Sequence, residues 1–479
     1  MCLLQQQSQM NLPQLADVEA IMTLHIRKSF LCLFSVILAA QSIAAAQVEQ
    51  APEFVWAVQA GGKLHDKTRG VAVDTRGNTF LTGEFAGTSR FGEHTITSAG
   101  EMDFFIAKCG PDGKFLWAHN GGGSAIDRGY GVATDAWGNC YVTGHYQSTN
   151  ATFSGNAVSH AGDYDIFVAK YSSAGKLLWV RNAGGKGYDY GHGIAVDADG
   201  NAVVTGALVG DGAFGQVSIS SPGGAHVFCA RYDAEGKLLW AEGAKGKASN
   251  SGHGVAMDGQ GNAYVGGYSG GIGTLGGLNL TNATGRDVFV AKITPAGKVA
   301  WVSEGHGSTN AMLHEITCDR AGNVWASGMF KGLLKLADKT AESHGDNDLL
   351  ITSYNTSGQR LWTRTGGGAR VDYGLGVACD KAGNAYLTGE FTDKAEIVGH
   401  ELTNAGSSDI FIAKFDRSGA LRWLLQAGGD KGDNAYTMVA DAQGNLYLSG
   451  SFSGTARFGR HAIMSAGGND VYLAKLKAK

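Results

Sequence analysis

The 479-residue sequence has only 5 prolines beside 74 glycines, and 17% of its residues are charged. Scarce proline and a hydrophobic fraction of 43% exclude a disordered chain and favour a globular protein with many glycine turns. An excess of positive charge is also absent, because the formal net charge is −4 and the body of the chain has no run of lysine or arginine. Nucleic acid is therefore not expected as a partner.

A hydrophobic run of membrane-spanning length is missing near the N-terminus. The run FLCLFSVILAA (30–40) has about half of the ~20 residues that a transmembrane helix needs. It follows Arg27 and Lys28, and Ala44 and Ala46 have the spacing that a signal peptidase reads. We predict a signal peptide over 22–46, with residues 1–21 as a doubtful extension and Met22 as an alternative start. The mature chain is expected to be secreted, periplasmic or on the cell surface, without a membrane span.

Cysteine is too sparse for a disulfide framework. Two of the seven cysteines lie ahead of the predicted cleavage point, which leaves an odd number without close pairs: Cys109, Cys140, Cys229, Cys318 and Cys379. We expect these to be small buried hydrophobic residues and do not pair Cys318 with Cys379.

A repeat fills the rest of the chain. The stretch DTRGNTFLTG begins at Asp74, and its copies follow at steps of 61 or 62 residues, beginning at Asp135, Asp197, Asp258, Asp319, Asp380 and Asp441. A tryptophan keeps the same step at Trp56, Trp117, Trp179, Trp240, Trp301, Trp362 and Trp423. A strand like DIFVAKY also recurs, from Asp103, Asp165, His226, Asp287, Asp348, Asp409 and Asp470. The repeats leave room for a single domain over 47–479 and for no linker.

Inside each repeat, the side-chain pattern has a period of two residues, which is typical of β-strands. GVAVD, NTFLTGEF, DFFIAKC and KFLWAHN are short runs between glycine-rich breaks, which predict four antiparallel strands and no helix. Seven such units predict an all-β fold, a seven-bladed β-propeller. Small residues such as Ala72 make GVAVD the innermost strand, where blades converge. The chain begins with a tryptophan strand, so we expect Phe54 to Val58 to pair with Asp470 to Leu476 and close the ring.

These motifs resemble a known family. The unit, with its G-V-A-V-D-x-x-G-N-x-Y-V-T-G core followed by F-G, S-A-G and D-x-F-x-A-K-Y, is similar to the bacterial seven-bladed beta-propeller (SBBP) repeat family. The resemblance covers Glu53 to Lys479 and implies an extracytoplasmic propeller. It implies no catalytic residue, and fold alone does not give function.

The repeated side chains have structural explanations. The aspartate of D-x-x-G-N could ligate calcium, but the loop lacks the bidentate acid of a calcium loop, so we interpret it as a hairpin turn. The tryptophans are expected to pack between blades, and the aspartate that opens DIFVAKY is expected to hydrogen-bond a loop of its own blade. Trp137 lies within a turn and is expected to be exposed.

The loop before each innermost strand is the candidate ligand site. Acids or amides stand eight residues before each turn aspartate in six copies, at Asp66, Asp127, Asp189, Asn250, Asp372 and Asp433. Three residues later stand larger polar side chains, at Arg69, Tyr130, His192, His253, His314 and Tyr436. We expect both sets to gather at one mouth of the central channel, where acids and aromatic rings suit hydroxyl-rich ligands.

Three functions remain open at this point. The first is a non-enzymatic binding protein for a glycan or protein ligand, without a cofactor and as a monomer. The second is a lyase or hydrolase acting on polysaccharide, in which His192, His253 and His314 could bind a metal. The third is a structural envelope module that binds through its blade edges or the face carrying Trp137.

Overall fold

The computed structural model describes residues 49–479, apart from 221–222, 248, 282–284, 337–338 and 478–479. The chain divides into two compact units, Met1–Glu49 and Gln50–Lys479, and every strand of the described residues lies in the second. The predicted extension over 1–21, the signal peptide over 22–46 and its cleavage after Ala46 lie outside the described residues. Within them, no helix is long and apolar enough to cross a membrane.

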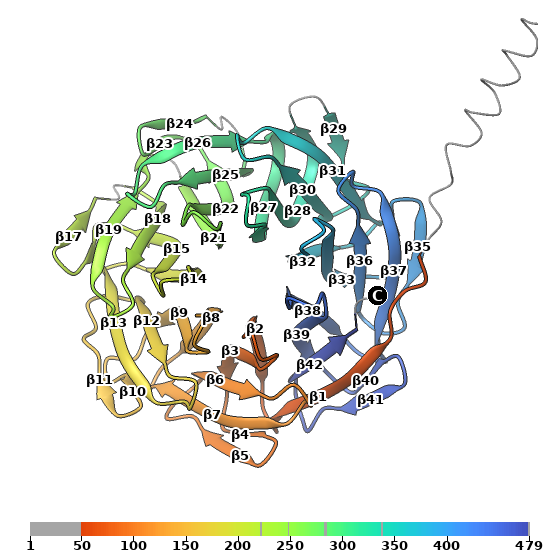
Figure 1. The fold of residues 1–479 in the computed structure, drawn as a ribbon, viewed down its shortest axis with the longest axis horizontal. Coiled ribbons are helices and arrows are strands. Elements are labelled where there is room, and N and C mark those ends of the chain that lie inside the picture. The colour runs from red at the N-terminus through yellow and green to blue at the C-terminus, as the bar shows by residue number, and fades with distance from the viewer. Residues whose placement is uncertain (1–48, 221–222, 248, 282–284, 337–338, 478–479) are drawn as a thin grey trace, which may run out of the picture. The chain divides into compact units, whose positions relative to one another are not determined.

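The described part of the chain is all-β and antiparallel, as predicted (Figure 1). Its first complete repeat shows the pattern: β2 (Asp66–Val73), β3 (Thr79–Phe85), β6 (Asp103–Cys109) and β7 (Phe115–Gly122) pair in that order. Their runs of β-branched and aromatic residues between glycine turns favour short strands.

The same four positions recur along the chain. The other innermost strands are β8 (Asp127–Thr134), β14 (Tyr190–Val196), β21 (Ser249–Met257), β27 (His306–Cys318), β32 (Tyr373–Cys379) and β38 (Asp433–Ala440). The second strands are β9 (Cys140–Tyr146), β15 (Ala202–Val209), β22 (Ala263–Gly270), β28 (Val324–Leu336), β33 (Ala385–Phe391) and β39 (Leu446–Phe452). The third are β12 (Asp165–Tyr171), β18 (Ala225–Tyr232), β25 (Asp287–Ile293), β30 (Asp348–Tyr354), β36 (Asp409–Phe415) and β42 (Asp470–Leu476). The fourth are β1 (Phe54–Gly62), β13 (Leu177–Gly185), β19 (Leu238–Gly243), β26 (Val299–Glu304), β31 (Arg360–Gly367) and β37 (Leu421–Gly429).

Each repeat also contains a short hairpin after its second strand, which the prediction of four strands per repeat missed. In the first repeat, β4 (Thr88–Phe91) and β5 (His94–Thr97) form it, and β4 pairs with the end of β1, which belongs to another sheet. Buried Phe91 and Ile96 hold the hairpin against the core. Further hairpin strands are β10 (Thr152–Phe153), β11 (Asn156–Ala157), β16 (Gly212–Phe214), β17 (Val217–Ile219), β23 (Ile272–Leu275), β24 (Leu278–Thr281), β29 (Lys339–Glu342), β34 (Lys394–Ile397), β35 (His400–Thr403), β40 (Thr455–Phe458) and β41 (His461–Met464), and β20 (Lys245–Gly246) pairs with β23.

The first strand of the described unit pairs with the last. Phe54 lies opposite Leu476, and Val58 lies opposite Leu473, so β1 forms the outer strand beside β42. This pairing was predicted from the order of the motifs and is confirmed. Figure 1 shows the innermost strands facing a common centre, the tryptophan strands farther out and the short hairpins beyond them.

The repeated aspartate and tryptophan have the structural roles that were predicted. Asp74 Oδ1 accepts hydrogen bonds from the backbone N–H groups of Arg76 and Asn78 at 2.9 Å each, and Gly77 takes a φ of +79°. Glycine adopts this left-handed conformation without steric cost, so the stretch is a hairpin turn. Trp362 Nε1 donates to the carbonyl of Arg417 at 2.9 Å, in the turn of the following repeat, and so packs between neighbouring sheets.

The predictions for the aspartate that opens the third strand, for Trp137 and for the cysteines also agree with the structure. Asp103 Oδ2 accepts from Ala99 N at 2.9 Å, within its own repeat. Trp137 is 58% exposed. The cysteines of the described residues are free, and three of them are fully buried: Cys109, Cys140 and Cys229.

Candidate functional site

The innermost strands share a β-bulge. In each of them the register of pairing with the second strand shifts at an equivalent residue, as between Thr68 and Gly70 in β2. The residues at the shift are Arg69, Tyr130, His192, His253, His314, Leu375 and Tyr436. A bulge re-aims side chains and is common beside binding sites.

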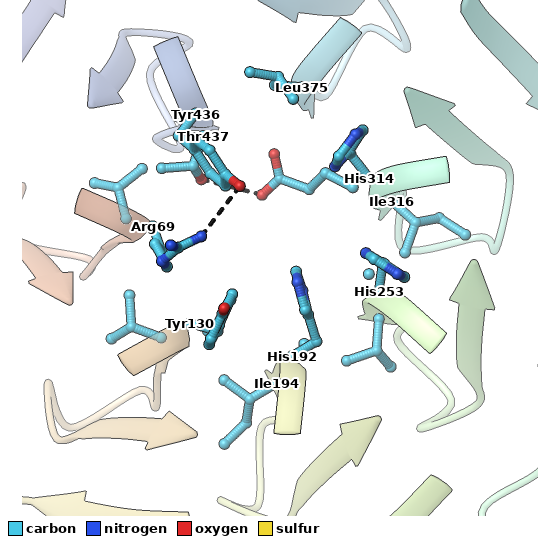
Figure 2. A pocket seen from close by; sticks show the side chains of 18 residues that line it. Arg69, Tyr130, His192, Ile194, His253, His314, Ile316, Leu375, Tyr436 and Thr437 are labelled. Atoms are coloured by element: carbon cyan, nitrogen blue, oxygen red, sulfur yellow. Dashed lines mark hydrogen bonds between the residues drawn. The ribbon is translucent and has the colours of Figure 1, made fainter. Parts of the chain in front are cut away.

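The bulged residues line one pocket of about 90 Å³. Figure 2 shows Arg69, Tyr130, His192, His253 and His314 surrounding it, with Tyr436 beside Arg69. Val71, Ile194 and similar residues contribute apolar walls. Six of the twelve predicted site residues are thus brought together.

The predicted acids do not join them, and their placement at the channel mouth is corrected. Asp127 is fully buried, and its Oδ2 accepts from Gly123 N at 2.8 Å and from Ser148 Oγ at 2.6 Å. Asn250 Oδ1 accepts from Val227 N at 2.7 Å. The other acids are also fully buried and outside the pocket lining: Asp66, Asp189, Asp372 and Asp433. Asp66, Asp189 and Asp372 cap the glycine-rich loops, because their carboxylates accept hydrogen bonds from backbone N–H groups of these loops.

Burial changes the protonation of these acids. It raises the pKa of Asp66 to about 6 and that of Asp433 to about 7. Removal from water disfavours the charged form of a carboxyl group, so its pKa rises.

Arg69 is the cation of the pocket. Its Nε and Nη2 donate to Glu84 Oε2 and Oε1 at 2.6 and 2.7 Å, and its Nη1 donates to the hydroxyl of Tyr436 at 3.2 Å. The guanidinium also lies 4.5 Å from the ring centroid of Tyr130, which is a cation–π contact. The paired Glu84 was not predicted, because its motif position holds other residues in most repeats.

Three imidazoles form one side of the pocket. The ring centroids of His192 and His253 are 4.4 Å apart, and those of His253 and His314 are 6.0 Å apart. Burial lowers the pKa of His192 to about 3 and that of His314 to about 4, so both rings are neutral near pH 7. In the described residues, no group of three or more His, Cys, Asp or Glu side chains is arranged to hold a metal ion.

Glu315 is a pocket residue that sequence reasoning missed. It directly follows the bulged His314, at a position that is glycine in most repeats, such as Gly70 and Gly131. A Cβ on Gly131 would lie 2.7 Å from the carbonyl oxygen of His192, which explains the glycine. The signal in the sequence was that two copies depart from this glycine, with Glu315 and Thr437, and that only one of them carries a carboxyl group.

Glu315 is held by two other innermost strands. Its Oε2 accepts from Val377 N in β32 at 3.0 Å, and its Oε1 accepts from Thr437 Oγ1 in β38 at 3.2 Å. Burial raises the pKa of Glu315 to about 8, so the group is a neutral carboxylic acid near pH 7. The pocket therefore combines a hydrogen-bond-donating acid, neutral imidazoles, phenol groups and one paired arginine.

The repeats, the antiparallel sheets and the shared pocket at their inner strands define a β-propeller repeat protein. No protein-family model matches the chain. An uncharacterized WD repeat-containing protein of Acanthamoeba polyphaga mimivirus is 22% identical over 455 residues, covering 76% of this chain and 32% of that protein. The chain thus spans about a third of the length of this relative.

Solved structures give distant matches. A calcium-binding protein, regucalcin, from Agrobacterium tumefaciens aligns with a TM-score of 0.33 and 8% identity, over 91% of this chain and 95% of its own. A gluconolactonase from Xanthomonas campestris aligns with a TM-score of 0.34 and 11% identity, over 90% and 91%. At these scores neither match says anything about the function of this chain.

Proposed function

We propose that the chain is a non-enzymatic binding protein that holds a hydroxyl-rich ligand in its central pocket. A glycan is the first candidate, and a protein ligand is the alternative. The observation that carries the proposal is the variation at the bulge: the repeats keep their turns and core, while the pocket position changes from arginine to tyrosine, histidine and leucine. A position that only packed sheets together would be expected to repeat like the tryptophans do.

The size and chemistry of the pocket favour the end of a ligand over its whole length. A volume of about 90 Å³ is well below the roughly 300–1,000 Å³ of pockets that enclose drug-sized molecules. Neutral imidazoles and a neutral carboxyl exchange hydrogen bonds with hydroxyl groups without a charge to bury. Tyr130 and Tyr436 add rings that can cover the face of a sugar.

The proposal includes the finer architecture and the location. We infer seven blades in a ring closed by β1, which the sevenfold motifs and the β1–β42 pairing support, and membership of the repeat family that the motifs resemble. We also propose an extracytoplasmic monomer without a cofactor, after cleavage near Ala46. N-terminal sequencing of the exported protein and light scattering on it test these points.

The binding function is tested with the full chain on a glycan array, followed by calorimetry on the sugars that bind. Substituting Tyr130→Ala or His192→Ala should weaken binding at least tenfold, whereas Trp137→Ala, an exposed aromatic outside the pocket, should leave it unchanged. Binding that survives both pocket substitutions would sink the proposal.

One observation favours an enzyme as the second candidate. The protonated Glu315 shares the pocket with neutral imidazoles, which is the pairing of a general acid with a general base. Turnover of any member of a polysaccharide panel, lost in Glu315→Gln with binding retained, would favour this candidate over pure binding.

A further inference from the structure

Two cations of the described residues stand beside the pocket outside any ion pair. Lys67 of β2 and Arg128 of β8 hold equivalent positions, two residues before the bulged Arg69 and Tyr130. In the described part of the chain, neither has a carboxylate within ion-pair distance, and the Nε of Arg128 is buried without a hydrogen-bond partner. We call Lys67 and Arg128 the basic pair.

The nearby carboxylates do not neutralise the basic pair. Glu84 is engaged by both the Nε and the Nη2 of Arg69. Glu390 is the other acid that acts on Lys67, and burial raises the pKa of this acid. Counting Lys67, Arg69 and Arg128 against these two acids leaves a positive excess.

The electrostatic effect of the cations reaches the neighbouring titratable groups. Burial is the main cause of the lowered pKa of His145, and the charges of Arg128 and Arg69 lower it further. The Nζ of Lys67 lies 4.4 Å from the ring centroid of Tyr436, which lines the pocket. Burial lowers the pKa of Lys67 to about 8, with the charge of Arg69 as the next cause. An anion bound here would relieve this unfavourable burial of positive charge.

A row of aromatic rings leads from the pocket to the surface at the same place. Ring centroids are 5.3 Å apart between Tyr130 and His145, 4.7 Å between His145 and Tyr164, and 5.1 Å between Tyr164 and Tyr188. Tyr188 is 54% exposed. Backbone hydrogen bonds hold the two outer tyrosines together, because Tyr164 N donates to Gly187 O at 3.2 Å.

We call Tyr130, His145, Tyr164 and Tyr188 the aromatic row. Its two outer rings lie on a backbone bridge between repeats that also forms without aromatic residues. At the positions of Tyr164 and Tyr188, the preceding repeat boundary has Met102 and Ile126, which form the same backbone bridge. The bridge itself therefore does not require aromatic rings. The C–H faces of sugar rings can pack on such apolar ring surfaces, and neighbouring rings offer several of these contacts to an extended chain.

From the basic pair and the aromatic row, we propose that the ligand is an acidic saccharide. This proposal rests on the proposed binding function, and it adds the chemical class of the ligand and the orientation of the saccharide chain in the site. A carboxylate of the sugar binds Lys67 and Arg128, its terminal unit enters the pocket, and the following units lie along Tyr164 and Tyr188. Arginine suits this contact, because its planar guanidinium matches a carboxylate.

The test measures calorimetric affinities of the full chain for oligosaccharides of galacturonate, glucuronate and mannuronate, each beside its neutral methyl ester. At least one acidic series should bind ten times more tightly than its ester, with an affinity that falls as salt rises. A six-unit chain should also bind more tightly than a monosaccharide. Equal binding of acid and ester overturns the ligand class while leaving the pocket function in place.

Single substitutions separate the contribution of the basic pair to the affinity from that of the exposed tyrosine. Lys67→Met and Arg128→Gln should each lower the affinity for the acid about tenfold and leave that for the ester unchanged. Tyr188→Ala should weaken the six-unit chain but not the monosaccharide. The matched controls, Lys176→Met in an exposed turn and Trp137→Ala, should change nothing.

Three outcomes count against the inference. Full affinity in both basic-pair variants would show that Lys67 and Arg128 do not bind the carboxylate. Equally tight binding of an oligoglutamate peptide would show that the ligand is not recognised as a saccharide. Binding of no sugar, together with no effect of Tyr130→Ala on any ligand found, overturns the proposed function as well.

Discussion

At the scale of single residues, the buried acids divide into two kinds. The loop acids such as Asp127 are engaged by backbone N–H groups and serve the fold. Glu315 instead stands in the pocket, where no equivalent residue of the repeats carries a carboxyl group. Repetition marks the structural acid, and departure from the repeat marks the candidate for function.

Asp127→Ala should destabilise the protein. The substitution leaves the N–H groups of Gly123 and Gln147 and the hydroxyl of Ser148 without their acceptor. We expect a loss of about 3 kcal/mol in the free energy of unfolding, measured by denaturant titration. Asp163→Ala, an exposed acid, is the control and should change stability by less than about 0.5 kcal/mol. An unchanged midpoint in Asp127→Ala would mean that this loop does not depend on its acid.

Glu315→Gln should stabilise the protein at high pH. The pKa of Glu315 is raised from 4.5 to about 8 in the folded state. Between these values the folded chain holds a proton that the unfolded chain lacks, so the contribution of Glu315 to the free energy of unfolding falls as pH rises. Glutamine lacks this charge, and its advantage over glutamate should grow by on the order of 4 kcal/mol from pH 5 to pH 9. Stability is compared at both pH values, with exposed Glu93→Gln as the control; a difference independent of pH would contradict the prediction.

At the scale of elements, the sequence predicted regular features better than exceptional ones. The four main strands, the glycine turn and the tryptophan contacts follow from a pattern that recurs with each copy. The hairpin formed by β4 and β5 was missed because two four-residue strands give little periodicity, although Phe91 and the glycine after it mark its turn. The acids were misplaced because chain spacing does not show whether a side chain turns toward a loop or a pocket.

The tryptophan contact between repeats can be measured through Trp362. Its indole N–H bonds the carbonyl of Arg417, and the turn glycine Gly419 lies against its ring. Trp362→Phe keeps an aromatic ring but removes the donor, and leaves the carbonyl without its partner. We expect a loss of about 1–2 kcal/mol in the free energy of unfolding. Trp137→Phe, at an exposed tryptophan, should have no effect; equal losses in both would show that the contact between repeats adds nothing.

At the scale of the whole molecule, the N-terminal strand is the feature with the largest expected effect. The outer strand of the last repeat comes from β1, which pairs with β42 from Phe54 to Ala60. Phe54 and Ala60 are buried, and Phe54 packs edge-on against Phe458 at a centroid distance of 5.4 Å. Without β1, the edge of β42 and this apolar surface would face water.

Removing β1 should therefore cost far more than its nine residues suggest. A chain that begins at Lys63 should aggregate or unfold at least about 10 °C below the full chain, because the exposed edge of β42 can pair with other chains. A chain that begins at Gln50 keeps β1 and controls for loss of the preceding residues. Thermal unfolding followed by circular dichroism and size-exclusion chromatography compares the two. Equal melting temperatures and monomeric elution for both would show that β1 does not close the fold, and a synthetic 50–62 peptide that restores the shorter chain would show that the pairing itself is what it lacks.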